Sequence, residues 1–480
     1  MNLSLSPNIK KAFTLALLIS LVLISTYYIA YMGSAYGIAL PMVIIASAIG
    51  MYTLINYRFG FYMAIVLGFT IFFMGRLMGD ALLFSFVVDA QINAAFAGLI
   101  IHKVIRREPF LKNTRHTITY AYLIYTLYLL LQIFNPEMDS IAGWFLVIRK
   151  FLQFVMIFFI AANGFDSIKR IRFYLLFWTI CAFAAGAYGC YQEWFGLFDF
   201  EMNWIWSVPG RAGLYSLDNG NFRKFGTLSG PAAYGILMAA SGLLMCILAI
   251  RNKAWYKRVL LLSAAAFVLL GMAYSGTRTA YFIFAAGCVL YILMTITNKS
   301  TLIVACLFLM GFVVLLWGPI YGNSTINRIR STFEFSDDAS MAVRDVNRAF
   351  IQPYIYSHPI GGGLATSGLQ GGLYNPNHYL AGFPPDSGFL KTVIETGWIG
   401  FFFQCLLYCL ILLAGVRVFY RTQDETIKTY SLTAVIVVFS FIVSQYGQVS
   451  IGQFPDCFLF YSLLAIIVRL SKLKNNQSIN

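Results

Sequence analysis

The chain has few charged residues. Asp, Glu, Lys and Arg make up 11% of its 480 residues, whereas a soluble domain of this length carries about 25%. Hydrophobic residues make up 59%, and they gather in runs long enough to cross a bilayer, which takes about 20 residues. The alternating ten-residue strands of membrane barrels are absent from the sequence. The composition therefore predicts an all-α fold, a polytopic transmembrane helix bundle.

Several kinds of chemical site are also missing from the sequence. The eight cysteines lie in or beside apolar runs and form no Cys-x-x-Cys pair, so neither a disulfide framework nor a zinc site is indicated. The histidines and acidic residues show no metal-ligand spacing, and no glycine-rich nucleotide loop is present. We therefore expect no metal and no cofactor, and the sequence argues against an ATP-driven pump.

Negative charge is scarce, with 19 acidic against 34 basic residues and a net charge of +15. Most basic residues lie in short loops between apolar runs. That distribution is typical of orientation signals and headgroup contacts, so we expect the lipid bilayer and not a nucleic acid as the partner. It predicts that both termini are cytoplasmic.

The apolar runs predict about 12–14 spans. One large outer-face loop with short helices interrupts them near the C-terminal end. We divide the chain into N-terminal spans at 1–134, of which the first is expected at 12–32, central spans at 135–320 with an outer loop at 192–230, the large loop at 321–388, and C-terminal spans at 389–480.

Four arginines map near the outer side of the bilayer: Arg149, Arg223, Arg278 and Arg344. Arg278 lies at a four-residue turn between two apolar runs. An arginine at this depth is costly unless it reaches the interface or meets an anion. One interpretation is that these side chains extend to the headgroup level. The other is that they bind phosphate, which a guanidinium contacts through two parallel hydrogen bonds.

Three carboxylates are candidates for a functional role. Asp386 stands where the large loop meets the next apolar run, and it could act as a general base on a sugar hydroxyl or as the N-cap of the helix that follows. Glu395, further into that run, is the second candidate. Asp89 falls within the fourth apolar run, where we favour a structural role with hydrogen-bond partners on other helices.

Two histidines of the large loop are candidates for substrate binding. His358 precedes a Pro-Ile-Gly-Gly-Gly sequence, which predicts a turn that brings backbone close to a ligand. His378 lies in an Asn-Pro-Asn-His-Tyr-Leu sequence.

The order of these motifs resembles the O-antigen ligase and O-antigen polymerase superfamily of bacterial membrane glycosyltransferases. The resemblance covers roughly residues 134–403. It rests on Gln132-Ile-Phe-Asn-Pro136, the span with Arg149, Phe222-Arg-Lys-Phe-Gly-Thr227, Ser275-Gly-Thr-Arg278, Ser340 to Arg344, and His358-Pro-Ile-Gly-Gly-Gly363. The ligases also have His, then Asn, Ser or Gln, nine residues, and Gly-x-x-Gly. This chain has Asp386-Ser387, nine residues, and Gly397-Trp-Ile-Gly400, so the spacing agrees and the first residue differs.

The resemblance implies a donor glycan carried on undecaprenyl diphosphate at the periplasmic face of the bacterial inner membrane. It implies that Arg223 and Arg278 hold the diphosphate leaving group, with Arg344 as a third contact. It also implies a reaction without metal. The carboxylate of Asp386 in place of the ligase histidine favours a polymerase, since related lipid-carrier polymerases use an acidic residue there.

The leading hypothesis is therefore an O-antigen or exopolysaccharide polymerase that inverts the anomeric centre. A chain-length regulator is a candidate partner. The first alternative is a ligase that moves the finished glycan to lipid A core or to a protein. The second is a flippase for lipid-linked glycans, which the scarcity of charge inside the spans disfavours.

Overall fold

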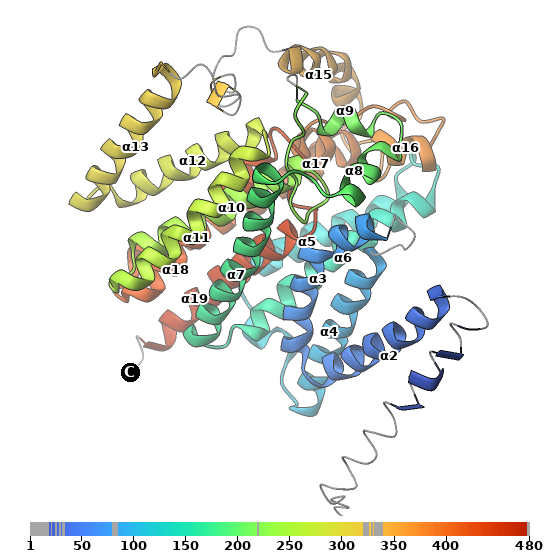
Figure 1. Cartoon of the computed structure of the whole chain (residues 1–480), viewed down its shortest axis with the longest axis horizontal. Coiled ribbons are helices and arrows are strands. Elements are labelled where there is room, and N and C mark those ends of the chain that lie inside the picture. The colour runs from blue at the N-terminus through green and yellow to red at the C-terminus, as the bar shows by residue number, and fades with distance from the viewer. Residues whose placement is uncertain are drawn as a thin grey trace, which may run out of the picture.

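The computed structural model of the chain describes residues 34–78, 85–217, 220–319 and 339–477, with short pieces between 19 and 30 and between 326 and 330. These residues form helices and connections, and the only β pairing among them is two isolated bridges. Figure 1 shows the arrangement. Most of the first predicted span, at 12–32, lies outside the described residues.

Thirteen long helices build the described bundle. They are α2 (Ser34–Ile55), α3 (Tyr57–Leu77), α4 (Ser85–Ile105), α5 (Thr117–Leu131), α6 (Ile141–Gly164), α7 (Ile168–Trp194), α10 (Pro231–Ile250), α11 (Trp255–Tyr274), α12 (Arg278–Thr295), α13 (Lys299–Trp317), α17 (Gly388–Arg421), α18 (Glu425–Ser444) and α19 (Asp456–Gln477). Among the described residues, ten helices are long and apolar enough to cross a membrane. The prediction of an all-α, multi-pass membrane protein is confirmed.

The remaining helices lie in the connections. They are η1 (Phe110–Asn113), η2 (Gln132–Phe134), α8 (Asp199–Trp206), α9 (Arg211–Tyr215), α15 (Ala339–Ser357) and α16 (Gly368–Tyr374). Figure 1 shows α8, α9, α15 and α16 gathered at one end of the bundle. We call this end, with segments 195–230 and 339–387, the loop face. The opposite end carries the short connections at 106–116, 165–167, 251–254 and 422–424. Basic residues lie in two of these connections and in the helix turns that adjoin the other two, and we call this end the basic face.

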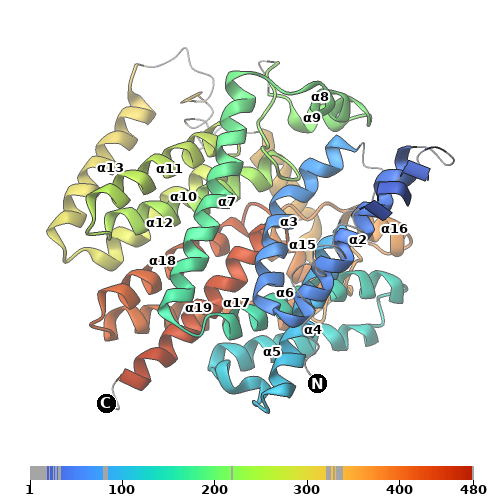
Figure 2. The same ribbon diagram turned by 60° about the horizontal axis from the view of Figure 1, so that its bottom comes forward.

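Helices α17 to α19 lie in the middle of the bundle. In Figure 2, α17 to α19 lie between α10 to α12 and α3 to α6. Small residues allow close approach, as is common between membrane helices. Gly242 of α10, for example, faces Leu269 of α11 so closely that an added Cβ would lie 2.5 Å from it. Helix α10 also begins with Pro231, whose fixed φ suits a first helical position.

Helix α17 is sharply kinked at Gly397. This residue has φ 67° and ψ −171° inside an otherwise helical run, a conformation that only glycine adopts readily. The carbonyl of Pro359 accepts a hydrogen bond from the amide of Trp398 at 2.9 Å. A Cβ on Gly397 would lie 2.0 Å from that carbonyl oxygen. The first glycine of the Gly-x-x-Gly motif therefore lets the loop dock into the kink.

Replacing Gly397 with alanine should destabilise the protein by about 3 kcal/mol or more, because the substitution adds both backbone strain and a clash with Pro359. Gly372 in α16 is the matched control, since nothing lies within 4 Å of its missing Cβ. Its alanine variant should melt within a few degrees of the wild type. Thermal unfolding of the two purified variants in detergent checks this; equal melting temperatures would contradict it.

Candidate functional site

The side chain of Arg223 is hydrogen-bonded to the turn that precedes Arg278. Its Nε donates to the carbonyl of Ser275 at 3.0 Å, and its Nη2 donates to Oγ1 of Thr277 at 2.9 Å. Gly276, between them, has φ +59° and passes close to the arginine side chain, so that an added Cβ would lie 3.7 Å from Nε. The fold thus brings together two arginines that are more than fifty residues apart in the sequence.

Segment 195–230 fixes the backbone around Arg223. The amide of Arg223 donates to the carbonyl of Tyr215 at 2.7 Å, and the Tyr215 hydroxyl donates to the carbonyl of Ser229 at 2.8 Å. Ile205, Tyr215 and Phe225 form a small apolar cluster beneath it. Segment 195–230 therefore has a small core of its own, which holds the backbone of Arg223 in place.

Arg76 of α3, which sequence reasoning missed, anchors the same loop from below. It is buried and donates to the carbonyls of Leu228 at 2.5 Å and Gly226 at 2.7 Å. Its guanidinium also lies 4.7 Å from the centre of the Phe225 ring. Gln192 accepts from the amide of Gly226 at 2.9 Å. An arginine at the end of an apolar run was the available signal, but its loop partner lies 150 residues away.

Arg278 is the first residue of α12. Thr277 is the N-cap, but its side chain does not cap the helix. Its Oγ1 instead accepts from Nη2 of Arg223 and donates to the carbonyl of Pro231, each at 2.9 Å. The first amides of a helix, with the positive end of its dipole, favour an anion. Arg223, Arg278 and this helix start therefore present positive charge and donors at one place on the loop face.

Ser387, and not Asp386, caps α17. The Ser387 hydroxyl accepts from the amide of Leu390 at 3.3 Å and donates to the carbonyl of Gln445 at 2.8 Å. The N-cap interpretation of Asp386 is therefore wrong. Asp386 lies one residue earlier, half-buried, with Oδ2 3.5 Å from the side-chain nitrogen of Asn347. Its carboxylate therefore does not cap α17 and can take part in a reaction.

Residues 445–447, between α18 and α19, connect the surroundings of Asp386 with those of Arg278. The amide of Gly388 donates to the carbonyl of Gln445 at 2.8 Å. At the other end, a Cβ on Gly447 would lie 3.0 Å from Oγ1 of Thr279, the residue after Arg278. The start of α17 and the start of α12 therefore meet the same three-residue segment. Sequence reasoning did not assign these residues to the site.

Helix α15 covers this part of the loop face. Arg348 donates to the hydroxyl of Tyr446 at 3.0 Å, and its guanidinium lies 4.7 Å from the centre of that ring. Arg344 is one helical turn earlier on α15, but its side chain lies outside what the structure describes. The prediction that Arg344 contacts the diphosphate stays a prediction.

A separate cleft of about 420 Å³ on the loop face contains both predicted histidines. It is lined by Pro136, Glu137, Asp139, Tyr354, His358, Asn377, His378 and Tyr379. Tyr354 stacks on Tyr379 with ring centres 5.2 Å apart and on His358 at 3.9 Å. Aromatic faces, carboxylates and imidazoles together suit a ligand with both apolar C–H faces and hydroxyl groups.

The two histidines have different hydrogen-bond partners at Nδ1. Nδ1 of His378 accepts from the amide of Leu380 at 3.0 Å, so its neutral ring carries the proton on Nε2. Nδ1 of His358 lies 3.0 Å from the carbonyl of Tyr354 and 2.8 Å from the hydroxyl of Ser357, so it can donate to either oxygen or accept from the hydroxyl. Burial lowers the pKa of His378, although Glu137 and Asp139 act in the opposite direction.

Glu395 lies away from this cleft. It is buried and its Oε1 accepts from the Ser367 hydroxyl at 2.5 Å, while its carbonyl accepts from the amide of Gly363 at 2.9 Å. These contacts hold the Gly-Gly-Gly turn against α17. They favour a structural role for Glu395 over the predicted role in substrate binding.

Three of the sequence motifs meet at that turn. Gln132 and Asn135, from the Gln-Ile-Phe-Asn-Pro motif, donate to the carbonyls of Ile360 at 3.3 Å and Gly361 at 2.9 Å. Gly361 in turn packs so closely on α17 that a Cβ would lie 2.4 Å from the amide nitrogen of Gly397. The motifs form a rigid support under the cleft.

Arg149 has a carboxylate partner inside the bundle. Its Nη1 lies 2.7 Å from Oδ2 of Asp89 on α4, and the guanidinium lies 4.9 Å from the centre of the Phe86 ring. The other polar residues of α4 are also paired, because Gln91 donates to Thr53 and Asn93 accepts from Gln153. The predicted partner of Asp89 on another helix is confirmed, and a structural role of Arg149 is favoured over substrate binding.

Asp89→Asn should destabilise the protein by about 1–3 kcal/mol, because it leaves the half-buried guanidinium of Arg149 without its counter-charge. The double variant Asp89→Leu, Arg149→Met removes both charges and should recover most of that loss. The melting temperature of the double variant should return toward that of the wild type. A double variant that is as stable as the wild type but inactive would instead place Arg149 in substrate binding.

Among the residues that the structure describes, no three His, Cys, Asp or Glu side chains lie close enough together to hold a metal ion. Residues 263–405 match the family model of the O-antigen ligases. The resemblance to the O-antigen ligase and polymerase superfamily is confirmed. The match runs from α11 into α17 and includes Arg278, Asp386 and both cleft histidines, while Arg223 precedes it. No curated protein matches the chain. The match supports a membrane enzyme that processes glycans in the manner of this superfamily.

Proposed function

We propose that this protein polymerises glycans carried on undecaprenyl diphosphate, at the periplasmic face of the bacterial inner membrane. The observation that best supports the proposal is the pair of hydrogen bonds that holds Arg223 on the turn before Arg278. Two guanidiniums and an uncapped helix start are the donors that a diphosphate needs. The basic connections at the other end of the bundle support a cytoplasmic position for that end and for both termini.

The reaction joins a sugar hydroxyl of the acceptor to C1 of the donor sugar. The bond between C1 and the diphosphate oxygen breaks, and the electron pair leaves with the diphosphate. Arg223 and Arg278 stabilise the charge that develops there, and fixed guanidiniums do so more strongly in the transition state than before it. Asp386 takes the hydroxyl proton. Attack opposite the leaving group inverts the anomeric centre, and charge neutralisation by arginine makes a metal ion unnecessary.

The histidine cleft would hold sugar rings of the glycan beside this centre. Tyr379 is exposed and offers a face for stacking. Nε2 of neutral His378 can donate to a sugar hydroxyl, and the His358 ring supplies a second polar group. Glu137 and Asp139 line the same cleft and disfavour acidic sugars, because like charges repel at short range.

The second candidate is a ligase that transfers the finished glycan to lipid A core or to a protein, and the description of the matching family model favours it. A deletion strain separates the two. Accumulation of single repeat units on the lipid carrier supports the polymerase. Full-length polymer that stays on the lipid carrier supports the ligase. A chain-length regulator is a candidate partner of the polymerase only.

A further inference from the structure

A pocket of about 430 Å³ opens on the basic face, at the far end of the bundle from the proposed active site. It lies between the start of α3 and the connection from α6 to α7. Its polar lining is Arg58, Ser167, Lys169 and Arg170, and its walls are Phe61, Tyr62, Ile160, Gly164, Phe165 and Phe173. The proposed reaction uses none of these residues.

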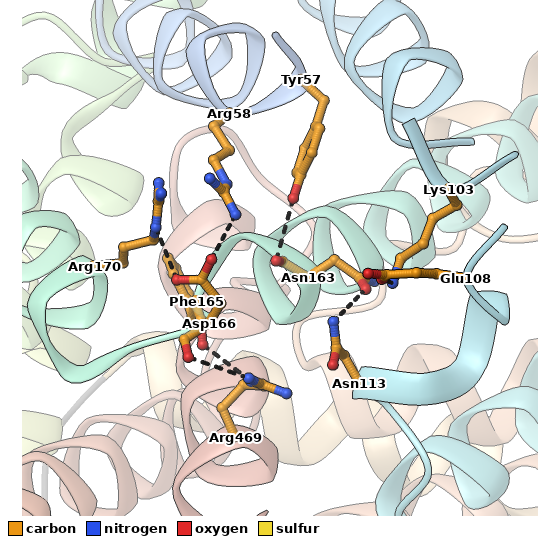
Figure 3. A network of polar contacts seen from close by, with 10 residues as sticks. All are labelled: Tyr57, Arg58, Lys103, Glu108, Asn113, Asn163, Phe165, Asp166, Arg170 and Arg469. Carbon is orange, nitrogen blue, oxygen red and sulfur yellow. Dashed lines mark hydrogen bonds and ion pairs between the residues drawn. The ribbon is translucent and has the colours of Figure 1, made fainter. Parts of the chain in front are cut away.

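The pocket carries excess positive charge. Asp166 is 2.7 Å from Arg58 and 2.8 Å from Arg170, so one carboxylate serves two guanidiniums (Figure 3). Arg469 of α19 is buried beside them and donates to the carbonyls of Phe165 at 3.0 Å and Asp166 at 3.5 Å. Lys169 is exposed at the rim. Four cations thus surround one anion, which favours a bound anionic group.

The start of α7 adds donors to the same place. Ser167 is its N-cap, but the Ser167 side chain makes no capping hydrogen bond. The first amides of this 27-residue helix and the positive end of its dipole therefore lie beside the cations. Together they are the elements of a phosphate site.

An apolar path leads from this pocket into the membrane. Phe173, which lines the pocket, is followed on the same face of α7 by Leu176 and Ile180. These side chains are 53%, 54% and 58% exposed, so they face lipid in a membrane-spanning helix. The spacing of three and four residues keeps them in one stripe. A free phosphate would not contact such an apolar stripe, whereas the acyl chain of a lipid would.

We propose that the pocket binds an anionic phospholipid of the leaflet at the basic face. The phosphodiester contacts Arg58, Lys169 and Arg170, and an acyl chain follows Phe173, Leu176 and Ile180. Bound there, the lipid neutralises the excess charge where α3, α6, α7 and α19 meet, and it stabilises that junction.

The test uses the purified full-length protein in a neutral detergent. Phosphatidylglycerol should raise its melting temperature and stay bound in native mass spectrometry, whereas phosphatidylcholine and inorganic phosphate should do neither. Each cation removed should weaken phosphatidylglycerol binding by about fivefold. Lys169→Gln with Arg170→Gln should therefore weaken it by about 25-fold.

Lys253→Gln with Arg258→Gln is the matched control, since it removes two exposed charges from the same face outside the pocket. It should leave phosphatidylglycerol binding unchanged. If the double pocket variant does not fold, the single variant Lys169→Gln replaces it in the test, because the side chain of Lys169 is exposed. Equal loss in pocket variant and control, or a shift with inorganic phosphate alone, would overturn the proposal. Neither result depends on glycan transfer.

Discussion

Replacing Arg278 with alanine should lower the rate of glycan transfer by about 10²–10³-fold, the loss expected when one fixed donor to a developing anion is removed. Arg278 is the first residue of α12 and follows Thr277, which accepts a hydrogen bond from the guanidinium of Arg223. Surface polysaccharide should disappear from a gel while the protein remains in the membrane at its normal level. Arg258→Ala, on the basic face, is the control and should leave the polymer unchanged.

The two arginines should act as a unit. If both hold the same diphosphate, the double variant of Arg223 and Arg278 should be little worse than either single variant. Arg223→Lys keeps the charge, but it cannot contact both Ser275 and Thr277 through a planar fork. It should therefore lose more than half of the activity. Normal polymer in Arg278→Ala would rule out the diphosphate clamp.

Asp386→Asn should lower transfer by about 10²–10⁴-fold, the usual contribution of a general base. The amide has the shape of the carboxylate, but it does not take up the hydroxyl proton. Retention of the lipid-linked donor should be unchanged, because the arginines remain. The measurements are the transfer rate and the amount of donor that copurifies with the variant.

Ser387→Ala separates the base from the helix cap. Loss of the cap should cost about 1 kcal/mol of stability, and transfer should stay near normal because Asp386 is retained. Normal polymer from the Asp386→Asn variant on a gel would show that Asp386 is not the general base. In that case His358, in the neighbouring cleft, would be the next candidate.

The sequence was sufficient to predict the helix bundle and the order of the motifs along the chain. Apolar runs predict the helices, and α10 (Pro231–Ile250) begins directly after the outer loop expected at 192–230. The loop at 192–230 could be predicted because a polar stretch between two spans must leave the membrane. The closeness of Arg223 and Arg278 followed only from family resemblance, since no rule of local sequence brings segments fifty residues apart together.

Other parts of the site depended on packing that the sequence does not display. Ser387 and Asp386 are both good capping residues, and the contact of Ser387 with Gln445 decides between them. Asp89 and Arg149 become partners only when α4 and α6 pack together. Residues 445–447 carry no motif, because their role depends on backbone position and on Gly447 being small.

The most direct test of the central claim is a reconstituted reaction. Purified protein in liposomes receives undecaprenyl-diphosphate-linked repeat units labelled in the sugar, and the products are separated by length. We expect new glycosidic bonds with release of undecaprenyl diphosphate, at a rate that falls by about 10²–10³-fold in Arg278→Ala. Movement of the labelled lipid across the bilayer without any new bond would contradict the account and identify a flippase instead.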